Sequence, residues 1–157
     1  MTKDQKYQKK YYQELKKSNQ IGINVDLISK KCIDYAYEII NENYEYAEYL
    51  IQCLSMCYKI PKIKVNLHIK PRPVSRSNTD LFGQYAPSSP GKQAQVDLWI
   101  LTRHKILVGP NEFMRTIIEE WMHHWDMKVL KFEISPHTKG FKKRIREVMR
   151  ALQVRIS

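Results

Sequence analysis

Residues 116–141 read TIIEEWMHHWDMKVLKFEISPHTKGF, and this stretch decides the fold. In its first half, apolar residues recur every three or four positions, which predicts a long helix from Glu112 to about Leu130 with one buried face. On the opposite face, Glu119, His123 and Asp126 lie within about 60° of one another when successive residues turn by 100°. The pattern therefore predicts a helix that presents carboxylates and a histidine side by side.

This polar face has two interpretations. It is either the solvated side of an amphipathic helix whose Trp121 and Trp125 pack into the core, or a set of ligands. His137 favours the second interpretation, because Pro136 precedes it in a connection that can lead the chain back over the helix. Metal ligands have to converge from a rigid helix and one later element, and this layout provides both.

The remainder of the chain predicts helices, then a small sheet, then a last helix. Apolar spacing predicts helices at residues 4–17, at a segment capped by Asn24 or Asp26, at 46–58 and at 139–154. Alternating apolar residues predict strands at 62–69, 82–86 and 94–101, with a loop at 70–80 and a hairpin turn at 87–91. We therefore expect one α+β domain over residues 1–157, with N-terminal helices and a small antiparallel sheet of about three strands. Residues 1–20 would be a basic, flexible extension of that domain.

Cysteine usage and hydropathy indicate an intracellular protein. No stretch approaches the ~20 apolar residues that cross a bilayer, and the lysine-rich start of the chain lacks the apolar core of a secretion signal. Cys32 is isolated in the sequence, whereas Cys53 and Cys57 are four residues apart in a helical stretch. That spacing favours neither a disulfide nor a zinc knuckle. We expect reduced thiols and a cytoplasmic protein that does not bind membranes.

The chain is strongly basic, with 27 lysines and arginines against 16 acids and a formal net charge of +11. Such a charge favours nucleic acid or another polyanion as a partner, although a solvated basic surface explains it equally well. The C-terminal residues that would contact phosphates are Lys142, Lys143, Arg144, Arg146 and Arg150.

Residues 116–141 resemble the SprT-like zinc metallopeptidases and related small bacterial and phage zincins. That family carries His-Glu-x-x-His on a helix, then a third histidine, often followed closely by Gly and Phe, as in Gly140-Phe141 here. The hairpin over residues 82–101 occupies the place of the strand that borders the family's active-site cleft. The resemblance covers roughly residues 60–153, and it implies a zincin-like fold with an active-site helix and a C-terminal basic helix.

The resemblance implies a role for each site residue. Glu120 would be the general base, and His123 and His137 would be the second and third metal ligands. Glu119 stands where the first histidine ligand belongs. Asp126 would orient a ligand histidine through its other ring nitrogen, or would be a plain surface acid.

Glu119 makes the metal site and the activity the open questions. A carboxylate binds zinc at about 2.0–2.2 Å, and two histidines with one carboxylate form a common catalytic set that also suits iron or manganese. However, the longer arm and the added negative charge of Glu119 should weaken zinc binding and raise the pKa of a bound water. We therefore expect an impaired, monomeric zinc peptidase that acts on protein or peptide substrates.

Two other functions remain open from the sequence. One is a catalytically inactive protein with a zincin scaffold that binds nucleic acid through its basic termini. Some members of the resembling family cleave DNA-bound proteins, so nucleic acid also fits as a partner of the peptidase. The other is a metal oxygenase with two histidines and one carboxylate, which fits less well because those enzymes usually carry their ligands on a β-barrel.

Overall fold

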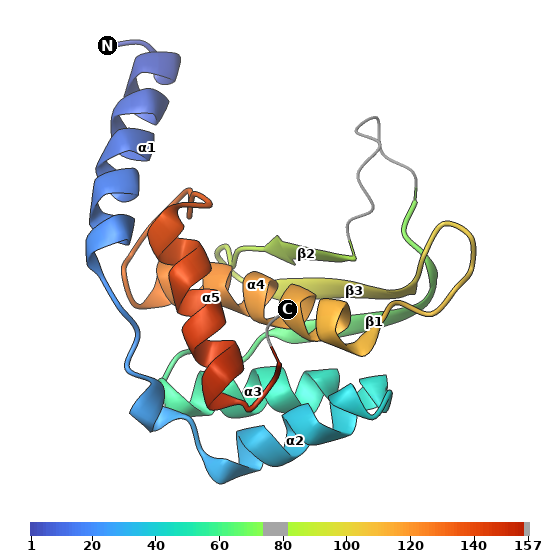
Figure 1. Ribbon diagram of the computed structural model, residues 1–157. Helices are drawn as coiled ribbons and strands as arrows, with labels where there is room; N and C mark the ends of the chain where they lie inside the picture. Colours follow the sequence, from blue (N-terminus) through green and yellow to red (C-terminus); the bar gives the residue numbers. More distant parts are fainter. Residues whose placement is uncertain (74–81, 156–157) are drawn as a thin grey trace.

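The computed structural model describes residues 1–73 and 82–155, and it has the α+β class expected from the sequence (Figure 1). The helices are α1 (Lys3–Gln20), α2 (Lys30–Ile40), α3 (Ala47–Cys57), α4 (Pro110–Lys128) and α5 (Lys139–Ala151). Short 3₁₀ turns lie at Val25–Leu27 and Tyr44–Tyr46. Among the described residues, no helix is both long and apolar enough to cross a membrane.

Three strands form a small mixed sheet in the order β1-β3-β2. β2 (Gly83–Ala86) and β3 (Gln95–Leu101) are antiparallel and make the expected hairpin, whereas β1 (Lys64–Pro71) runs parallel to β3. The expectation of an all-antiparallel sheet is therefore wrong. Alternation of apolar residues specifies which side chains face the core, but it does not specify the direction of a neighbouring strand. Of the predicted loop at residues 70–80, the first two residues lie in β1 and residues 74–80 lie outside the described residues.

Capping residues explain where several helices begin. The Thr2 side chain accepts the backbone N–H of Gln5, and the Gln5 side chain accepts that of Thr2, so a reciprocal capping box opens α1. Asn24, expected to cap the second helix, caps the 3₁₀ turn before it instead. Pro110 occupies the first turn of α4, where a missing N–H costs nothing. Thr138 caps α5 by accepting the N–H of Phe141 at 2.9 Å.

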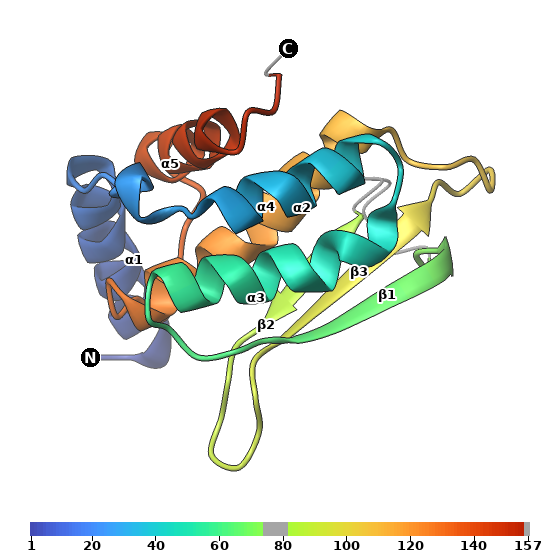
Figure 2. The same cartoon turned by 90° about the horizontal axis from the view of Figure 1, so that it is seen from below.

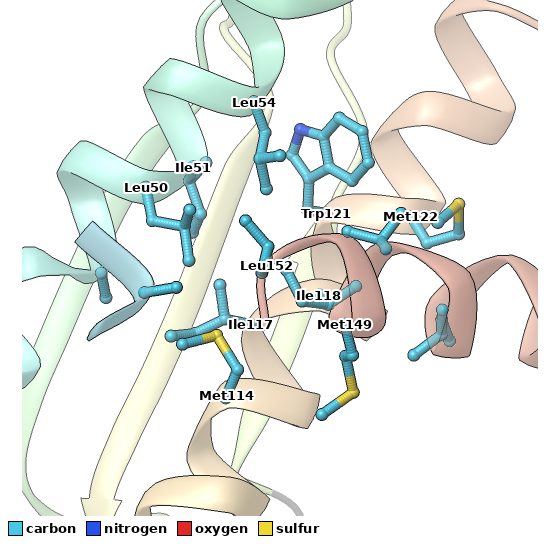
Figure 3. Close-up of a cluster of buried hydrophobic side chains, with 14 of the residues drawn as sticks. Leu50, Ile51, Leu54, Met114, Ile117, Ile118, Trp121, Met122, Met149 and Leu152 are labelled. Carbon is cyan, nitrogen blue, oxygen red and sulfur yellow. The ribbon is translucent and has the colours of Figure 1, made fainter. Parts of the chain in front are cut away.

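Helix α4 runs through the middle of the molecule and is surrounded by α2, α3, α5 and the sheet (Figures 1 and 2). Figure 3 shows its apolar face meeting α3 and the end of α5; the labelled core residues are Leu50, Ile51, Leu54, Met114, Ile117, Ile118, Trp121, Met122, Met149 and Leu152. The Trp121 indole donates to Ser55 Oγ at 3.2 Å inside this core. Because close packing fixes α4 on several sides, it is a rigid platform for the polar residues on its remaining face.

The N-terminal helix is attached to the domain through its second half. Its first turns project away from the other elements in Figure 1, with Tyr7 and Tyr12 exposed. Further along, Ser18 is buried, and its hydroxyl lies 2.8 Å from Thr138 Oγ1. A Cβ on Gly140 would lie 2.2 Å from the Ser18 carbonyl oxygen, so only glycine permits this approach. The second half of α1 is thus packed against the start of α5 rather than extending freely from the domain.

Candidate functional site

Two histidines meet at the surface of α4. His123 lies on α4, and His137 directly precedes Thr138 at the start of α5. Their Nε2 atoms are 2.9 Å apart, and their rings stack with centroids at 4.9 Å. The Phe141 ring packs against both imidazoles, at 4.8 Å from His123 and 4.9 Å from His137. The Phe of the Gly-Phe pair therefore fixes the planes of the two histidines.

A buried hydrogen-bond chain sets the tautomer of His123. The Ser135 hydroxyl donates to Asp126 Oδ2 at 2.9 Å, so its oxygen accepts from His123 Nδ1 at 2.8 Å. With Nδ1 protonated, the Nε2 lone pair of His123 points toward His137. Burial, and secondarily the nearby His137, lower the pKa of His123 to about 4. His123 is therefore neutral at pH 7 and available as a ligand through Nε2.

Asp126 is fully buried and not a surface acid. Its other carboxylate oxygen, Oδ1, lies 3.0 Å from Arg144 Nη2 in a buried ion pair. Burial raises the pKa of Asp126 to about 6, although Arg144 and Ser135 oppose the shift, so the carboxylate is ionised at neutral pH. Asp126 thus orients His123, but it does so through Ser135 rather than by direct contact.

Arg144 does not belong to the exposed basic surface expected from the sequence. Its side chain is 1% exposed, and besides Asp126 it donates to the backbone carbonyls of Ser18 at 2.7 Å and Ile21 at 3.0 Å. A buried guanidinium that joins three segments cannot contact phosphates. The other four residues of that set, Lys142, Lys143, Arg146 and Arg150, are exposed.

The segment that carries Ser135 is held by Glu14 of α1. The buried Glu14 carboxylate accepts the backbone N–H groups of Glu133 at 2.9 Å, Ile134 at 3.0 Å and Ser135 at 2.9 Å. Ser135 has a φ of 54°, in the left-handed region that a serine adopts only where its surroundings fix it. Sequence reasoning missed Glu14 because no local spacing links residues 121 positions apart. It missed Ser135 because its left-handed backbone, which turns the hydroxyl toward His123 and Asp126, has no signal in the local sequence.

Glu119 does not converge with the two histidines on one point. Its carboxylate lies 4.0 Å from His137 Nδ1, whereas Nε2 of His137 faces His123. The 4.0 Å separation is too long for a hydrogen bond, so Glu119 does not fix the orientation of His137 in this arrangement. The Glu119 side chain remains about one-third exposed, at 34%.

Glu120 lies in a cleft of about 270 Å³ between α4 and β2. A Cβ on Gly83 would lie 2.9 Å from Glu120 Cγ and 2.6 Å from Thr116 Cγ2, so the strand passes directly over the carboxylate. Burial, and then the charge of Glu119, raise the pKa of Glu120 to about 7, against the opposing effects of Arg72 and the Tyr85 backbone. A carboxylate with that pKa can both take up and release a proton at neutral pH.

His124 has a structural role. It is fully buried, with Nδ1 at 2.8 Å from the Tyr85 hydroxyl and Nε2 at 2.8 Å from the carbonyl oxygen of Pro61. Nε2 donates to that carbonyl, so Nδ1 accepts from Tyr85 and neither nitrogen is left for a ligand. This histidine joins α4 to β2 and to the segment that precedes β1.

The three cysteines form a second polar cluster, and this cluster could hold a metal ion. Cys32 Sγ lies 2.7 Å from Cys53 Sγ and 3.8 Å from Cys57 Sγ, and all three sulfurs lie within 4.8 Å of one another. The view of Cys32 as an isolated cysteine is therefore wrong in three dimensions. Within residues 1–73 and 82–155, no other three His, Cys, Asp or Glu residues bring ligand atoms this close together.

Comparisons with protein-family models, with curated proteins and with solved structures gave no match. The chemistry assigned to these sites therefore rests on their own residues and geometry.

Proposed function

We propose that this chain is a zincin-like metallopeptidase whose metal affinity is weakened by Glu119. The observation that carries the proposal is the pair formed by His123 and His137, whose Nε2 atoms lie 2.9 Å apart. Glu120 is on the same helix as His123, and both line the cleft under β2. Two histidine ligands and a carboxylate with a raised pKa supply two of the three metal ligands and the general base that a zinc-dependent hydrolase uses.

The donor set fits a zinc ion in part. His123 is neutral and has its Nε2 lone pair free of the Ser135 contact, as a zinc ligand must. His137 Nε2 would be the second donor. Glu119 fits less well, because its carboxylate lies on the Nδ1 side of His137. This offset supports a weakly held ion, for which iron and manganese compete with zinc.

When bound, zinc would act as a Lewis acid that polarises the scissile carbonyl and lowers the pKa of a water molecule to about 7. Glu120 would take the proton from the attacking water and deliver it to the leaving amine. The raised pKa of Glu120 suits both transfers near pH 7. Ser135 and Asp126 would keep His123 in the tautomer that leaves Nε2 unprotonated.

The cleft favours an extended peptide as the substrate. Among the described strands, β2 is at the edge of the sheet and borders the cleft, so a peptide in β-conformation could pair with it. Arg72 is beside this edge, where it donates to the Gly83 carbonyl at 3.4 Å and to Gln84 Oε1 at 3.2 Å. Its positive charge would favour peptides with an acidic residue at that position. We expect the enzyme to act in the cytoplasm.

Metal binding tests the ligand assignment. The protein is purified without chelator, and zinc content and affinity are measured for a Cys57→Ser parent and for the same parent carrying His123→Ala/His137→Ala. All variants carry Cys57→Ser, which removes one thiol from the separate cysteine cluster. We expect one zinc ion per chain in the parent and none in the double variant. Equal zinc content in the two proteins would contradict the assignment.

The Glu119→His variant tests whether Glu119 weakens zinc binding. A histidine at this position restores a neutral ligand in place of a carboxylate, so zinc affinity and casein cleavage should both rise by about tenfold or more. Glu119→Gln is the matched control, because it removes the charge without supplying an imidazole. Equal zinc affinities in the native protein and in both variants would show that this position is irrelevant to the metal.

Nucleic-acid binding is a second candidate function, favoured by one observation. The exposed Arg115, Arg146 and Arg155 line a groove of about 720 Å³ beside α4 and α5. Such a groove suits phosphate contacts more than base recognition. Affinity for a DNA duplex should fall steeply as the salt concentration rises. In a plot of the logarithm of the binding constant against the logarithm of the salt concentration, Arg146→Ala should reduce the magnitude of the slope by about one. Binding without salt dependence would exclude this function.

A further inference from the structure

The cysteine cluster lies between α2 and α3, two helices that pack side by side (Figure 2) on the side of the molecule away from β2 (Figure 1). Cys53 and Cys57 are four residues apart on α3, so their side chains share one face of that helix. Cys32 is in the first turn of α2, across from them. The three sulfurs therefore converge from two rigid helices, which is the arrangement that a metal site needs.

We propose that Cys32, Cys53 and Cys57 form a trithiolate site for a thiophilic d¹⁰ metal ion, Zn²⁺ or Cu⁺. Zinc–sulfur bonds of about 2.3 Å place the sulfurs of a tetrahedral or trigonal site roughly 3.8–4.0 Å apart. The observed 3.8 Å between Cys32 and Cys57 matches this separation. The 2.7 Å between Cys32 and Cys53 has to widen by about 1 Å, which a small side-chain rotation on binding achieves.

The serine next to the cluster has an orientation that favours thiolates. Ser29 is the N-cap residue of α2, yet its side chain makes no capping hydrogen bond. Its hydroxyl oxygen instead lies 3.5 Å from both Cys32 Sγ and Cys53 Sγ. A hydroxyl donor at this position would stabilise negative charge on sulfur, as hydrogen bonds around metal-bound thiolates do. The positive end of α2 at the same point acts in the same direction.

Binding would be an exchange of protons for a cation. Burial and the neighbouring thiols raise the pKa of Cys32, so this thiol is protonated at neutral pH without an ion. Each sulfur that binds the metal releases one proton, and no electron is transferred. Metal affinity should therefore rise with pH.

An open groove of about 420 Å³ beside the cluster provides access for the ion. Cys53 and Cys57 line it, together with Lys31 and Met56. Met56 is 70% exposed, which is unusual for a methionine and leaves its thioether free to act as a soft ligand. Lys31 would offset the negative charge of a trithiolate complex. A water molecule or the Met56 sulfur could complete the coordination from this groove.

The test uses a chain without the histidine pair, so that it is independent of the proposed peptidase site. His123→Ala/His137→Ala is reduced, freed of metal with a chelator, and titrated with Zn²⁺ or Cu⁺ in separate experiments. We expect one ion per chain, protection of all three thiols from alkylation, and three sulfur neighbours at about 2.3 Å in the X-ray absorption spectrum of the zinc form.

The matched control adds Cys57→Ser, which changes a half-buried residue and should leave the helix content unchanged by circular dichroism. This variant should bind either ion at least about tenfold more weakly. If the reduced parent binds neither Zn²⁺ nor Cu⁺, the proposal is overturned. This holds even if Cys32 and Cys53 form a disulfide in air, because the titration uses the reduced protein. Equal affinity in the Cys57→Ser variant would overturn the proposal as well.

Discussion

The Glu14 carboxylate accepts the backbone N–H of Ser135 at 2.9 Å, across 121 positions of the chain. The same carboxylate accepts two further N–H groups from this segment, so α1 holds the residues between α4 and α5 in place. Ser135 in turn orients His123. The geometry of the histidine pair therefore depends on a helix that is remote in sequence.

Glu14→Ala should destabilise the protein and disturb the histidine pair. It leaves three buried or half-buried N–H groups without their acceptor, at a cost of about 2–4 kcal/mol in the free energy of unfolding. Urea denaturation measures this cost. Glu133→Gln is the control, because Glu133 is an exposed residue whose side chain pairs with Lys10 at the surface, and it should change stability by less than about 0.5 kcal/mol. Similar losses in the two variants would argue against the role of Glu14.

Removing the Ser135 hydroxyl should weaken metal binding more than it weakens the fold. Ser135→Gly suits the φ of 54° and loses only the hydroxymethyl group, so it separates the side chain from the backbone conformation. Without this link, His123 Nδ1 has no fixed partner, and zinc affinity should fall about 10- to 100-fold. Isothermal titration calorimetry checks the affinity. An unchanged affinity would show that the Asp126–Ser135–His123 chain does not orient the ligand.

Glu120→Gln should stabilise the metal-free protein at neutral and alkaline pH. The folded-state pKa of Glu120 is raised from 4.5 to about 7, so the folded chain binds this proton more tightly than the unfolded chain. The stabilisation of the folded chain by this tighter proton binding is fully present below pH 4.5, and it is lost as the pH rises through about 7. Glutamine cannot ionise, so the variant should be more stable than the parent by up to about 3 kcal/mol at pH 8, with little difference at pH 4. Thermal or urea unfolding of the two proteins from pH 4 to pH 8, in the presence of chelator, measures this difference in stability. A stability difference that does not change with pH would contradict the prediction.

Gly83→Ala should reduce both stability and peptidase activity. Its Cβ would lie 2.6 Å from Thr116 Cγ2 and 2.9 Å from Glu120 Cγ, so β2 or the carboxylate has to move. Overpacking of this kind costs about 1–3 kcal/mol. Gly109→Ala is the matched control, since no atom lies within 4 Å of its Cβ position. If unfolding curves and cleavage rates of the two variants coincide, β2 does not press on Glu120.

The parts of the fold that could be predicted from the sequence are those that local spacing determines. The periodicity around Trp121 predicted α4, and the turn residues after Ala86 predicted the β2–β3 hairpin. The parallel pairing of β1 with β3 was not predictable, because a strand's apolar pattern reads the same in either direction. Within the site, the pairing of His123 with His137 followed from the motif.

The contacts that complete the site join distant residues and carry no local signal. Glu14 looks like any acid in a lysine-rich helix, and Arg144 looks like part of a basic surface until burial is known. The cysteine cluster was missed for the same reason, since Cys32 is 21 positions from Cys53 and only the packing of α2 on α3 brings them together. Ionisable residues gave the least reliable predictions, because their roles depend on burial that spacing alone does not specify.

The cleavage rate of zinc-loaded protein with and without Glu120 tests the central claim most directly. Casein hydrolysis is measured for the native sequence and for Glu120→Gln at pH 7.5–8, about the pH at which Glu120 is mostly ionised. We predict cleavage by the native protein and a loss of at least about 100-fold in the variant, with zinc content unchanged. Equal rates in the two proteins, or no cleavage by a fully zinc-loaded native chain, would contradict the account.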